Sequence, residues 1–556
     1  MKPVFLRWPI LAALSLIALL LAACAGGLPE GSLPTLAPTH TPVSHATPTF
    51  PALPTAPPPP PVDWSETAIF RQAMRPAFAD EVEAFAGRNR YYIEATLELG
   101  DVVTLYGAER VRYTNRSEDT LEEIVFRLYP NLDAFSGEMR ILSVTVAGEP
   151  VTPALQERRS VLRVPLPTPL QTGESVELTL HFESAIERGF SASYGEYSFQ
   201  RGVFTAPEWY PVLSVYEEGH GWWTERSTTI QGEQTYTETG LYEVLLTADE
   251  DVTIVLSGTE IETIDNGDGT LTHHVVSGPM RDSILIASRS LIPVSGEVDG
   301  ITVNVYYWDV PDADTLRRNE RAAHAGLRIA IDSLATFNRV FGPYPFNEFD
   351  VVQTNTAAGG IEYPGVIVVA NNYWNTGDDF FETVIAHEVA HQWWYSLVGN
   401  NQVAYPFIDE SLTSFSEYVY YWETAESERE VQQARDFVRN EQRLYNSYLG
   451  GGNPDLPLGL STDHYVEFQY SLIIYTKGPL FFNEIAEQIG REMMYRVLQE
   501  FFRRHRYEVA EIRDILDVFE DVTGQDWDPF FYEWVGNFPG LDPAAVATVD
   551  ALQSGG

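Results

Sequence analysis

Two histidines and a glutamate near the middle of the chain have the types and spacing needed to hold and use a metal ion. His387, Glu388 and His391 form an H-E-x-x-H pentad, in which the histidines are four residues apart. The segment from Phe381 to Leu397 is largely apolar and contains no Pro or Gly, which predicts a buried helix. Positions four apart on a helix lie one above the other, so both imidazoles can face one point. Glu388 would lie beside that point, as a general base for water activated by the metal.

A zinc hydrolase needs a third protein ligand and leaves a fourth position open to water. Glu410 follows His391 after eighteen intervening residues, at the start of a second predicted apolar helix. If the two helices are antiparallel, Glu410 closes a His₂Glu site, and Glu417 on the same face can orient a ligand imidazole. Two histidines on an apolar helix can also be ordinary core residues, but the added carboxylate favours the metal site. We therefore expect one Zn²⁺ per chain, bound by His387, His391 and Glu410.

This constellation resembles the aminopeptidase N family of zinc metallopeptidases, the gluzincins. The resemblance rests on the segment His387–Trp394, the eighteen-residue gap, and Asp409-Glu410-Ser411, which stands where the family usually has N-E-G. It covers roughly residues 90–537 and is strongest around residues 359–417 and at Tyr475. The resemblance implies an all-β, saddle-like N-terminal domain followed by a thermolysin-like α+β catalytic domain.

A glycine-rich segment upstream of the pentad resembles the family's G-x-M-E-N element. Here it reads Gly359-Gly360-Ile361-Glu362-Tyr363, with Ile and Tyr in place of the Met and the Asn. The resemblance implies that Gly359 and Gly360 belong to a strand that pairs with the substrate backbone, and that Glu362 binds the free α-amino group. A carboxylate placed there would position a cationic amine one residue from the bond to be cleaved. Without the resemblance, a glycine-rich strand end with a solvated Glu is an equally open interpretation.

A second short segment downstream resembles the family's Y-x-K-G element. It reads Tyr475-Thr476-Lys477-Gly478, and Tyr475 lies 65 residues after Glu410. The resemblance implies that Tyr475 donates a hydrogen bond to the tetrahedral oxyanion. A phenol suits this role because it stays neutral near pH 7 and donates a directional bond. From composition alone, one Tyr among 29 would be a core aromatic.

The overall composition narrows the function classes. The chain has 556 residues, enough for two or three domains, and a net charge of −44 from 35 basic and 79 acidic residues. This charge argues against nucleic acid as a partner. Cys24 is the only cysteine, so the folded body has no intrachain disulfide, thiolate metal site or cysteine nucleophile. Any metal site must therefore be built from His and carboxylate side chains.

The amino terminus predicts export. Two basic residues precede an uncharged apolar run, and the small residues Ala22 and Ala23 stand before Cys24, as in a bacterial lipoprotein signal. We expect cleavage before Cys24 and lipidation of that residue, which would anchor the protein to the outer face of a bacterial cell membrane. An uncleaved membrane anchor is the alternative, although the apolar run is slightly short for a spanning helix.

The pattern along the rest of the chain predicts the domain organisation. A tether rich in Pro and Thr cannot build a packed core, and period-two alternation further on predicts strands. Asp265–Gly269 is predicted to be a hairpin turn, because the spacing of a calcium loop is absent. No length remains for the C-terminal helical cap of larger family members, so we expect none. The predicted segments are a signal peptide (1–23), a tether (24–62), a helical lead-in (63–90), a β-rich domain (91–298), a catalytic domain (299–540) and a tail (541–556).

Together these features predict a zinc-dependent peptidase that removes N-terminal residues from peptides outside the cell. Two alternatives stay open. The first is a thermolysin-like endopeptidase with the same zinc site and an idle Glu362, because Tyr363 replaces the family's Asn. The second is a catalytically inert surface lipoprotein that binds a partner.

Overall fold

The computed structural model describes residues 62–132, 135, 137–191, 196–225, 232 and 235–542. They belong to one compact unit, which begins at Val62. Within these ranges, no helix combines the length and the hydropathy needed to cross a bilayer. The predicted signal peptide, Cys24 and nearly all of the tether lie outside the described residues. Where a helical lead-in was predicted, the chain forms two 3₁₀ helices, η1 (Ala68–Ala73) and η2 (Ala79–Phe85).

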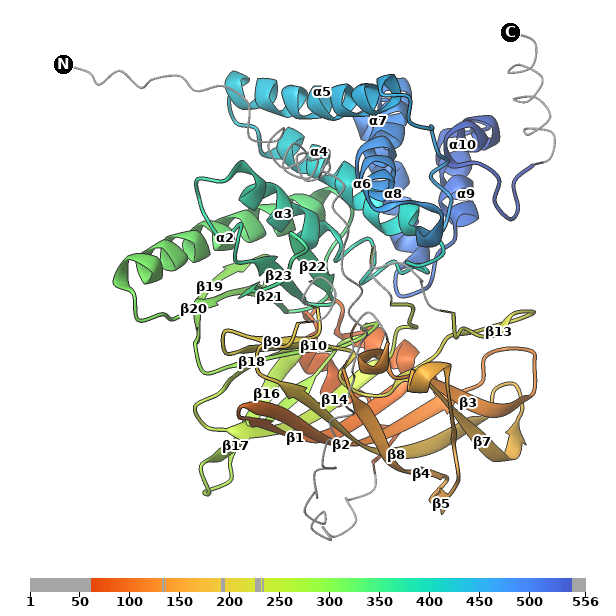
Figure 1. The fold of residues 1–556 in the computed structure, drawn as a ribbon. Coiled ribbons are helices and arrows are strands. Elements are labelled where there is room, and N and C mark those ends of the chain that lie inside the picture. The colour runs from red at the N-terminus through yellow and green to blue at the C-terminus, as the bar shows by residue number, and fades with distance from the viewer. Residues whose placement is uncertain are drawn as a thin grey trace, which may run out of the picture. The chain divides into compact units, whose positions relative to one another are not determined.

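The N-terminal half is built on a large, mostly antiparallel sheet (Figure 1). Its strand order is β16-β17-β14-β1-β2-β8-β4-β5, with β1 and β14 parallel. Along β2, buried and less buried residues alternate, as expected for a strand with one face on the core. The strands are β1 (Arg90–Leu99), β2 (Val102–Thr114), β4 (Met139–Val146), β5 (Glu149–Pro150), β8 (Ser175–Glu187), β14 (Leu241–Asp249), β16 (Thr259–Asp265) and β17 (Thr270–Val276).

Three smaller sheets complete this half of the described chain. Two have four strands, in the orders β15-β18-β10-β9 and β11-β3-β7-β6, and β12 and β13 form a hairpin. Their strands are β3 (Leu121–Arg127), β6 (Ala154–Gln156), β7 (Val161–Leu170), β9 (Ser198–Gln200), β10 (Val203–Pro207), β11 (Val212–Leu213), β12 (Tyr216–Glu217), β13 (Gly221–Trp222), β15 (Thr253–Leu256) and β18 (Ile284–Ser288). The predicted β-rich N-terminal region is thus confirmed at this level.

The turn between β16 and β17 is the hairpin that the sequence predicts. Asp265 Oδ1 accepts a hydrogen bond from Gly267 N at 2.8 Å, and Asp268 Oδ1 accepts one from Thr270 N at 3.1 Å. Gly267 and Gly269 have φ values of 75° and 90°, which residues with a side chain rarely adopt. The aspartates therefore bond to the turn's own backbone.

A five-stranded mixed sheet carries the second half, in the order β19-β20-β21-β23-β22. Its strands are β19 (Leu291–Val298), β20 (Ile301–Trp308), β21 (Glu348–Thr354), β22 (Gly360–Tyr363) and β23 (Val366–Ala370). β19 pairs with β20 along its whole length, so the predicted domain boundary after residue 298 falls in the hairpin that joins these two strands. Alternation identifies a strand but not the sheet that it joins.

Helices cover this sheet and form the rest of the chain up to Val535 (Figure 1). The helix α2 begins at an N-cap in which Asp312 accepts a hydrogen bond from Thr315 N, and Asp378 caps α3 in the same way through Phe380 N. The α-helices are α2 (Ala313–Val340), α3 (Asp379–Ala390), α4 (Leu412–Thr424), α5 (Glu428–Gly450), α6 (Glu467–Leu472), α7 (Gly478–Ile489), α8 (Arg491–His505), α9 (Ile512–Thr523) and α10 (Asp528–Val535).

The helix that carries the pentad is shorter than predicted. It ends at Ala390 and His391 is its C-cap, whereas the sequence predicted a helix from Phe381 to Leu397. Past the cap the chain turns back, and Tyr395 has a φ of 135°. The buried Arg281 of the β-rich half donates to Tyr395 O at 2.7 Å. This contact between distant segments thus stabilises the turn that follows α3, and the local sequence contains no Pro or Gly that would predict the end of the helix.

Candidate metal centre

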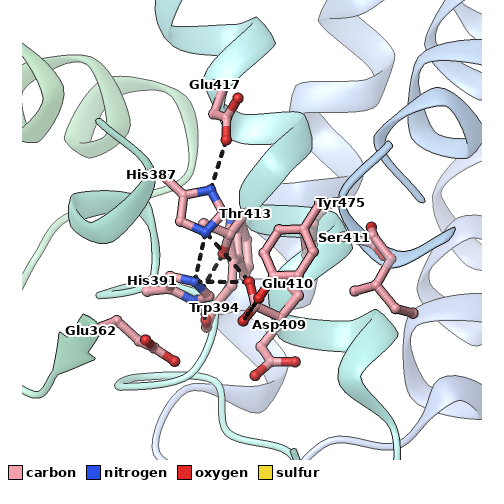
Figure 2. A network of polar contacts seen from close by, with 12 residues as sticks. Glu362, His387, His391, Trp394, Asp409, Glu410, Ser411, Thr413, Glu417 and Tyr475 are labelled. Atoms are coloured by element: carbon pink, nitrogen blue, oxygen red, sulfur yellow. Dashed lines mark hydrogen bonds and ion pairs between the residues drawn. The ribbon is translucent and has the colours of Figure 1, made fainter. Parts of the chain in front are cut away.

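Three side chains from α3, its C-cap and the following helical segment converge on one point (Figure 2). The Nε2 atoms of His387 and His391 are 3.1 Å apart. Glu410 Oε2 lies 3.4 Å from each of them. All three residues are buried, with exposed fractions of 8%, 1% and 2% respectively. The structure therefore brings together the three predicted zinc ligands.

The dimensions of this group fit a zinc ion. Ligand atoms bonded to one tetrahedral Zn²⁺ at about 2.0–2.2 Å lie about 3.3–3.6 Å from one another. The separations of 3.1, 3.4 and 3.4 Å are close to that range. Glu410 Oε2 is also a buried acceptor that has no hydrogen-bond partner in the described part of the chain. Burying a carboxylate oxygen without a partner costs free energy of folding unless another group binds it. Two imidazoles and a carboxylate are ligands that suit zinc.

Both imidazoles are held with Nε2 toward the ligand point. His387 Nδ1 is 2.7 Å from Glu417 Oε1, and His391 Nδ1 is 3.0 Å from the carbonyl oxygen of Trp394. Since a carboxylate and a carbonyl can only accept, each Nδ1 carries the proton. Glu417 thus lies where the sequence predicts an orienting carboxylate. Thr413, which the sequence analysis missed, places its hydroxyl 3.1 Å from His391 Nδ1.

Glu388 lies beside the ligand point, packed against the start of β22. Its exposed fraction is 4%. A Cβ added at Gly360 would lie 2.5 Å from Glu388 Oε1 and 2.6 Å from its Cγ. The absence of a side chain at Gly360 therefore leaves room for the Glu388 carboxylate. Gly359 faces Phe380 and Val384 of α3 in a similar close contact.

Glu362 is brought to the same centre by β22, the edge strand of the five-stranded sheet. One carboxylate oxygen each from Glu362 and Glu388 and one ring nitrogen of His391 all lie within 4.8 Å of one another. The side chain of Gln392, in the turn after α3, fastens the strand to that turn, since it accepts from Gly365 N at 2.8 Å and donates to Tyr363 O at 3.1 Å. An edge strand has backbone groups available to a further extended chain.

Tyr475 approaches the ligands from the opposite side to Glu362 in the view of Figure 2. Its hydroxyl donates to Glu410 Oε1 at 2.5 Å. Glu410 and Tyr475 lie in two π-helical turns, η6 (Phe407–Ser411) and η8 (Ile473–Lys477). A Cβ at Gly478 would be 2.0 Å from Ser411 Oγ, so the glycine of the Y-x-K-G segment lets these turns pack closely. Such turns are often found at functional sites.

Comparison with known proteins agrees with this geometry. Residues 326–534 match the model of the peptidase family M1 domain. This part of the chain carries a peptidase family M1 domain. It is 24% identical to aminopeptidase M1 of Arabidopsis thaliana over 261 residues, and 27% identical to aminopeptidase N of Lactococcus lactis subsp. lactis over 256 residues. Each match covers 42% of this chain and less than a third of the relative, namely 27% and 29%.

The fold has solved relatives of similar size. The structure resembles the M1 zinc metallopeptidase of Deinococcus radiodurans with a TM-score of 0.58 and 17% identity, over 82% of this chain and 95% of that one. A mutant of the Deinococcus protein has been solved with a Tyr-Ser-Ala substrate and matches with a TM-score of 0.57 and 16% identity, over 82% of this chain and 95% of that one. At this level of identity the likeness is one of fold.

Two further residues of the M1 site were missed by the sequence analysis. Gln402 donates from Nε2 to Glu362 Oε1 at 3.0 Å and to Asp409 Oδ2 at 2.9 Å. Asn400 donates to the other carboxylate oxygen of Asp409 at 3.0 Å. This network links Glu362 to the residue before the ligand Glu410. The run of amide side chains Asn400-Asn401-Gln402 between apolar segments could have indicated a buried polar network. One of its partners, Glu362, is distant in sequence, so the run alone does not identify the network.

The charges of the M1 site support one another. Burial opposes ionisation of His391, but Glu362 and Glu410 outweigh it and raise the pKa of His391 to about 9. Burial likewise opposes ionisation of Glu410, but the neighbouring His387 and His391 hold its pKa below the usual range. Burial raises the pKa of Glu388 to about 8, with Glu362 adding to the effect. That value suits a group that accepts and returns a proton near neutral pH.

Zinc affinity is expected to fall as the pH is lowered from 9 to 6. A ligand imidazole must be neutral, and the raised pKa means that His391 holds a proton below about pH 9, which zinc must displace. Each displaced proton costs about tenfold in apparent affinity per pH unit. Competition with a chromophoric chelator, corrected for the chelator's own titration, measures this slope. An affinity independent of pH over this range would contradict the protonation that we assign.

Replacing Gly360 with Ala is expected to lower turnover about tenfold or more, with zinc affinity nearly unchanged. The added methyl group overlaps Glu388, which must move, while the zinc ligands have no such contact. Steady-state kinetics and zinc content measure the two effects. Gly450→Ala is the matched control, because a Cβ at Gly450 meets nothing within 4 Å. Equal activity of the two variants would rule out the packing role of Gly360.

Proposed function

We propose that the chain is a zinc-dependent aminopeptidase that removes N-terminal residues from peptides outside the cell. The observation that carries this proposal is the position of Glu362, whose carboxylate lies within 4.8 Å of ligand atoms of Glu388 and His391. A substrate amine bound to Glu362 would hold the first peptide bond against the metal centre. The chain spans less than a third of the length of the curated relatives it matches. Their activities therefore support the proposal only for the M1 domain.

The residues of the centre divide the chemistry among them. His387, His391 and Glu410 would hold Zn²⁺, which when bound supplies a Lewis acid and lowers the pKa of water. Glu388 accepts the proton that the attacking water loses and returns it to the nitrogen of the leaving peptide. Water and one peptide bond are consumed, and an amino acid and a shortened peptide are released.

Two residues position the substrate and the developing charge. Glu362 accepts hydrogen bonds from the protonated α-amine, and Gln402 fixes the orientation of its carboxylate through the bond at 3.0 Å. Tyr475 stands at the ligand Glu410, from which its hydroxyl can turn to donate to the oxyanion of the transition state. The hydroxyl is a neutral donor, and its bond to Glu410 keeps it beside the centre until it turns.

The test is hydrolysis of aminoacyl amides by the full-length chain with zinc added. Each amide is supplied with a free and an acetylated amine, and Glu388→Gln is the control. We expect cleavage of the free-amine compounds alone, abolished in the control. Cleavage of blocked peptides at internal bonds would identify a thermolysin-like endopeptidase with the same site. If protein that is shown to contain zinc hydrolyses none of the substrates, an inert binding protein would be favoured.

We also propose that the protein is exported and anchored to the outer face of a bacterial cell membrane through lipidated Cys24. The support is the sequence of the first 24 residues. Mass spectrometry of the protein made in a bacterium should find a cleaved chain that begins with a lipid-modified Cys24. A Cys24→Ser variant should lack the lipid modification, and a parent chain that begins at Met1 and carries no lipid would contradict the lipid anchor.

A further inference from the structure

The second imidazole of the metal centre is oriented by the turn that follows it, residues 391–399, which we call the ligand turn. His391 Nδ1 lies 3.0 Å from the carbonyl oxygen of Trp394, inside this turn, and 3.1 Å from the hydroxyl of Thr413. Figure 2 shows Trp394 next to His391. The direction of the Trp394 carbonyl therefore contributes to the ring orientation of His391, and with it to the direction of Nε2.

The backbone of the ligand turn does not hold this carbonyl by itself. The amides of residues 395–398 donate to the carbonyl oxygens of residues 391–393 and 398, so the carbonyls of Trp394 and Tyr395 receive no backbone donor in the described part of the chain. Tyr395 has a φ of 135°, which residues with a side chain rarely adopt. The bond that φ describes lies between these two carbonyls. Relaxation of φ would therefore turn one carbonyl relative to the other.

Arg281, from the β-rich half, supplies the missing donor. Its side chain is 1% exposed, and its Nε donates to Tyr395 O at 2.7 Å. The rest of the guanidinium donates to the carbonyl oxygens of Thr237, at 3.0 Å, and of Glu508. A guanidinium is planar and its donors have fixed directions, so one group holds these three carbonyls in a fixed arrangement. A Cβ at Gly399 would overlap the guanidinium, so a glycine in the ligand turn leaves room for it.

The residue next to Arg281 holds the side chain of Tyr395. The Tyr395 hydroxyl donates to Asp282 Oδ2, and both residues are buried. Two consecutive residues of a distant segment thus bind the carbonyl and the phenol of Tyr395. Together these bonds stabilise a backbone conformation that is unfavourable for an isolated tyrosine.

We propose that Arg281 is a positioning residue for the zinc centre, which holds Tyr395 so that the Trp394 carbonyl can orient His391. This inference rests on the zinc centre of the proposed function, but not on which peptide bond is cleaved. Joining the two halves of the chain would need only the bonds to Thr237 and Glu508 and would affect no particular ligand. A positioning role requires an effect on His391 and not on His387, whose Nδ1 bonds to Glu417 instead.

The first test is the zinc affinity of folded variants. Arg281→Lys keeps the positive charge but cannot bind three carbonyls in a fixed arrangement, so we expect it to weaken zinc binding about tenfold. Arg90→Lys is the matched control, because Arg90 is 2% exposed and donates to the carbonyls of Trp64 and Glu66, before β1. Unfolding temperatures of the zinc-free proteins measure the stability that each variant loses.

The outcomes of this comparison separate the inference from the proposed function. Arg90→Lys should bind zinc as the parent does, even where its unfolding temperature falls. Equal zinc affinities of Arg281→Lys and the parent would overturn the inference and leave the proposed function intact. A parent chain that binds no zinc would overturn both.

A spectroscopic measurement distinguishes the two imidazoles. In protein loaded with Co²⁺, unpaired electrons shift the NMR signals of the ring N–H protons of both ligand histidines away from all others. Arg281→Lys should move or broaden the signal of His391 and leave that of His387 unchanged. Glu417→Gln should do the reverse, which assigns the two signals. Equal changes of both signals in Arg281→Lys would refute the positioning role.

Replacing Tyr395 with Gly tests the role of the backbone conformation. Glycine adopts positive φ at little cost, so the ligand turn needs less support in this background. We expect the loss of zinc affinity caused by Arg281→Lys to shrink from about tenfold to about threefold or less in Tyr395→Gly protein. Each loss is measured against its own background, so the missing phenol does not enter the comparison. A tenfold loss in both backgrounds would overturn the inference.

Discussion

Replacing Glu388 with Gln is expected to lower turnover about a thousandfold or more and to leave zinc affinity nearly unchanged. Proton transfer by a positioned general base contributes about 10²–10⁴ in rate, and an amide cannot accept the proton of water. Glu388 lies beside the three ligands without being one of them, with its carboxylate against Gly360. Steady-state kinetics and zinc content per chain measure the two quantities.

The control for this change lies on the same helix. Glu382 is exposed on α3 and accepts a hydrogen bond from Tyr420 at 3.0 Å, away from the ligand point. Glu382→Gln should keep full activity, so that an effect of helix stability is separated from an effect of the missing base. Turnover by Glu388→Gln within tenfold of the parent would remove Glu388 from the mechanism and leave the zinc centre in place.

Local sequence patterns were enough to predict the core of this site. The four-residue spacing of His387 and His391, and the carboxylate of Glu410 eighteen intervening residues later, depend on helix geometry and on one short connection. The hairpin at Asp265–Gly269 and the helix α2 follow from equally local signals. A single sequence predicts well those structural features that depend on a few residues close together in the sequence.

Features that depend on distant contacts were not predictable in this way. The pentad helix ends at His391 where a buried Arg281, more than a hundred residues earlier, bonds to the turn. The sheet that β19 joins is decided by its pairing with β20. Gln402 became part of the site only when Glu362 and Asp409 were brought to it. None of these partners can be found from periodicity.

The small cavity beside Glu362 illustrates the same limit. Its carboxylates come from Glu196 and Glu208 in the β-rich half and Glu362 in the catalytic half. Each of them is an ordinary acidic residue in a chain with 79 Asp and Glu. Only their burial together sets them apart, since a carboxylate on the surface keeps its hydration and a buried one loses it. The group of His387, His391 and Glu410 can thus be predicted from sequence, but the carboxylates buried around this cavity cannot.

Replacing Glu410 with Ala is expected to weaken zinc binding about a thousandfold. A three-ligand protein site that supplies roughly 10–16 kcal/mol loses about a third of it with one ligand, which corresponds to about three powers of ten. Glu410 Oε2 lies 3.4 Å from both imidazole Nε2 atoms, so no other oxygen takes its place without movement. Competition titrations with a chelator, and the stabilisation that zinc gives against unfolding, measure the loss.

Glu417→Gln provides the graded comparison for this change. Glu417 touches the outer nitrogen of His387 at 2.7 Å and not the ligand point, and such partners typically alter metal affinity about 10–100-fold. We therefore expect zinc affinity to fall in the order parent, Glu417→Gln, Glu410→Ala, with unfolding of the zinc-free proteins changed far less. If Glu410→Ala binds zinc as tightly as Glu417→Gln, the third ligand is a different residue and the assignment of the centre is wrong.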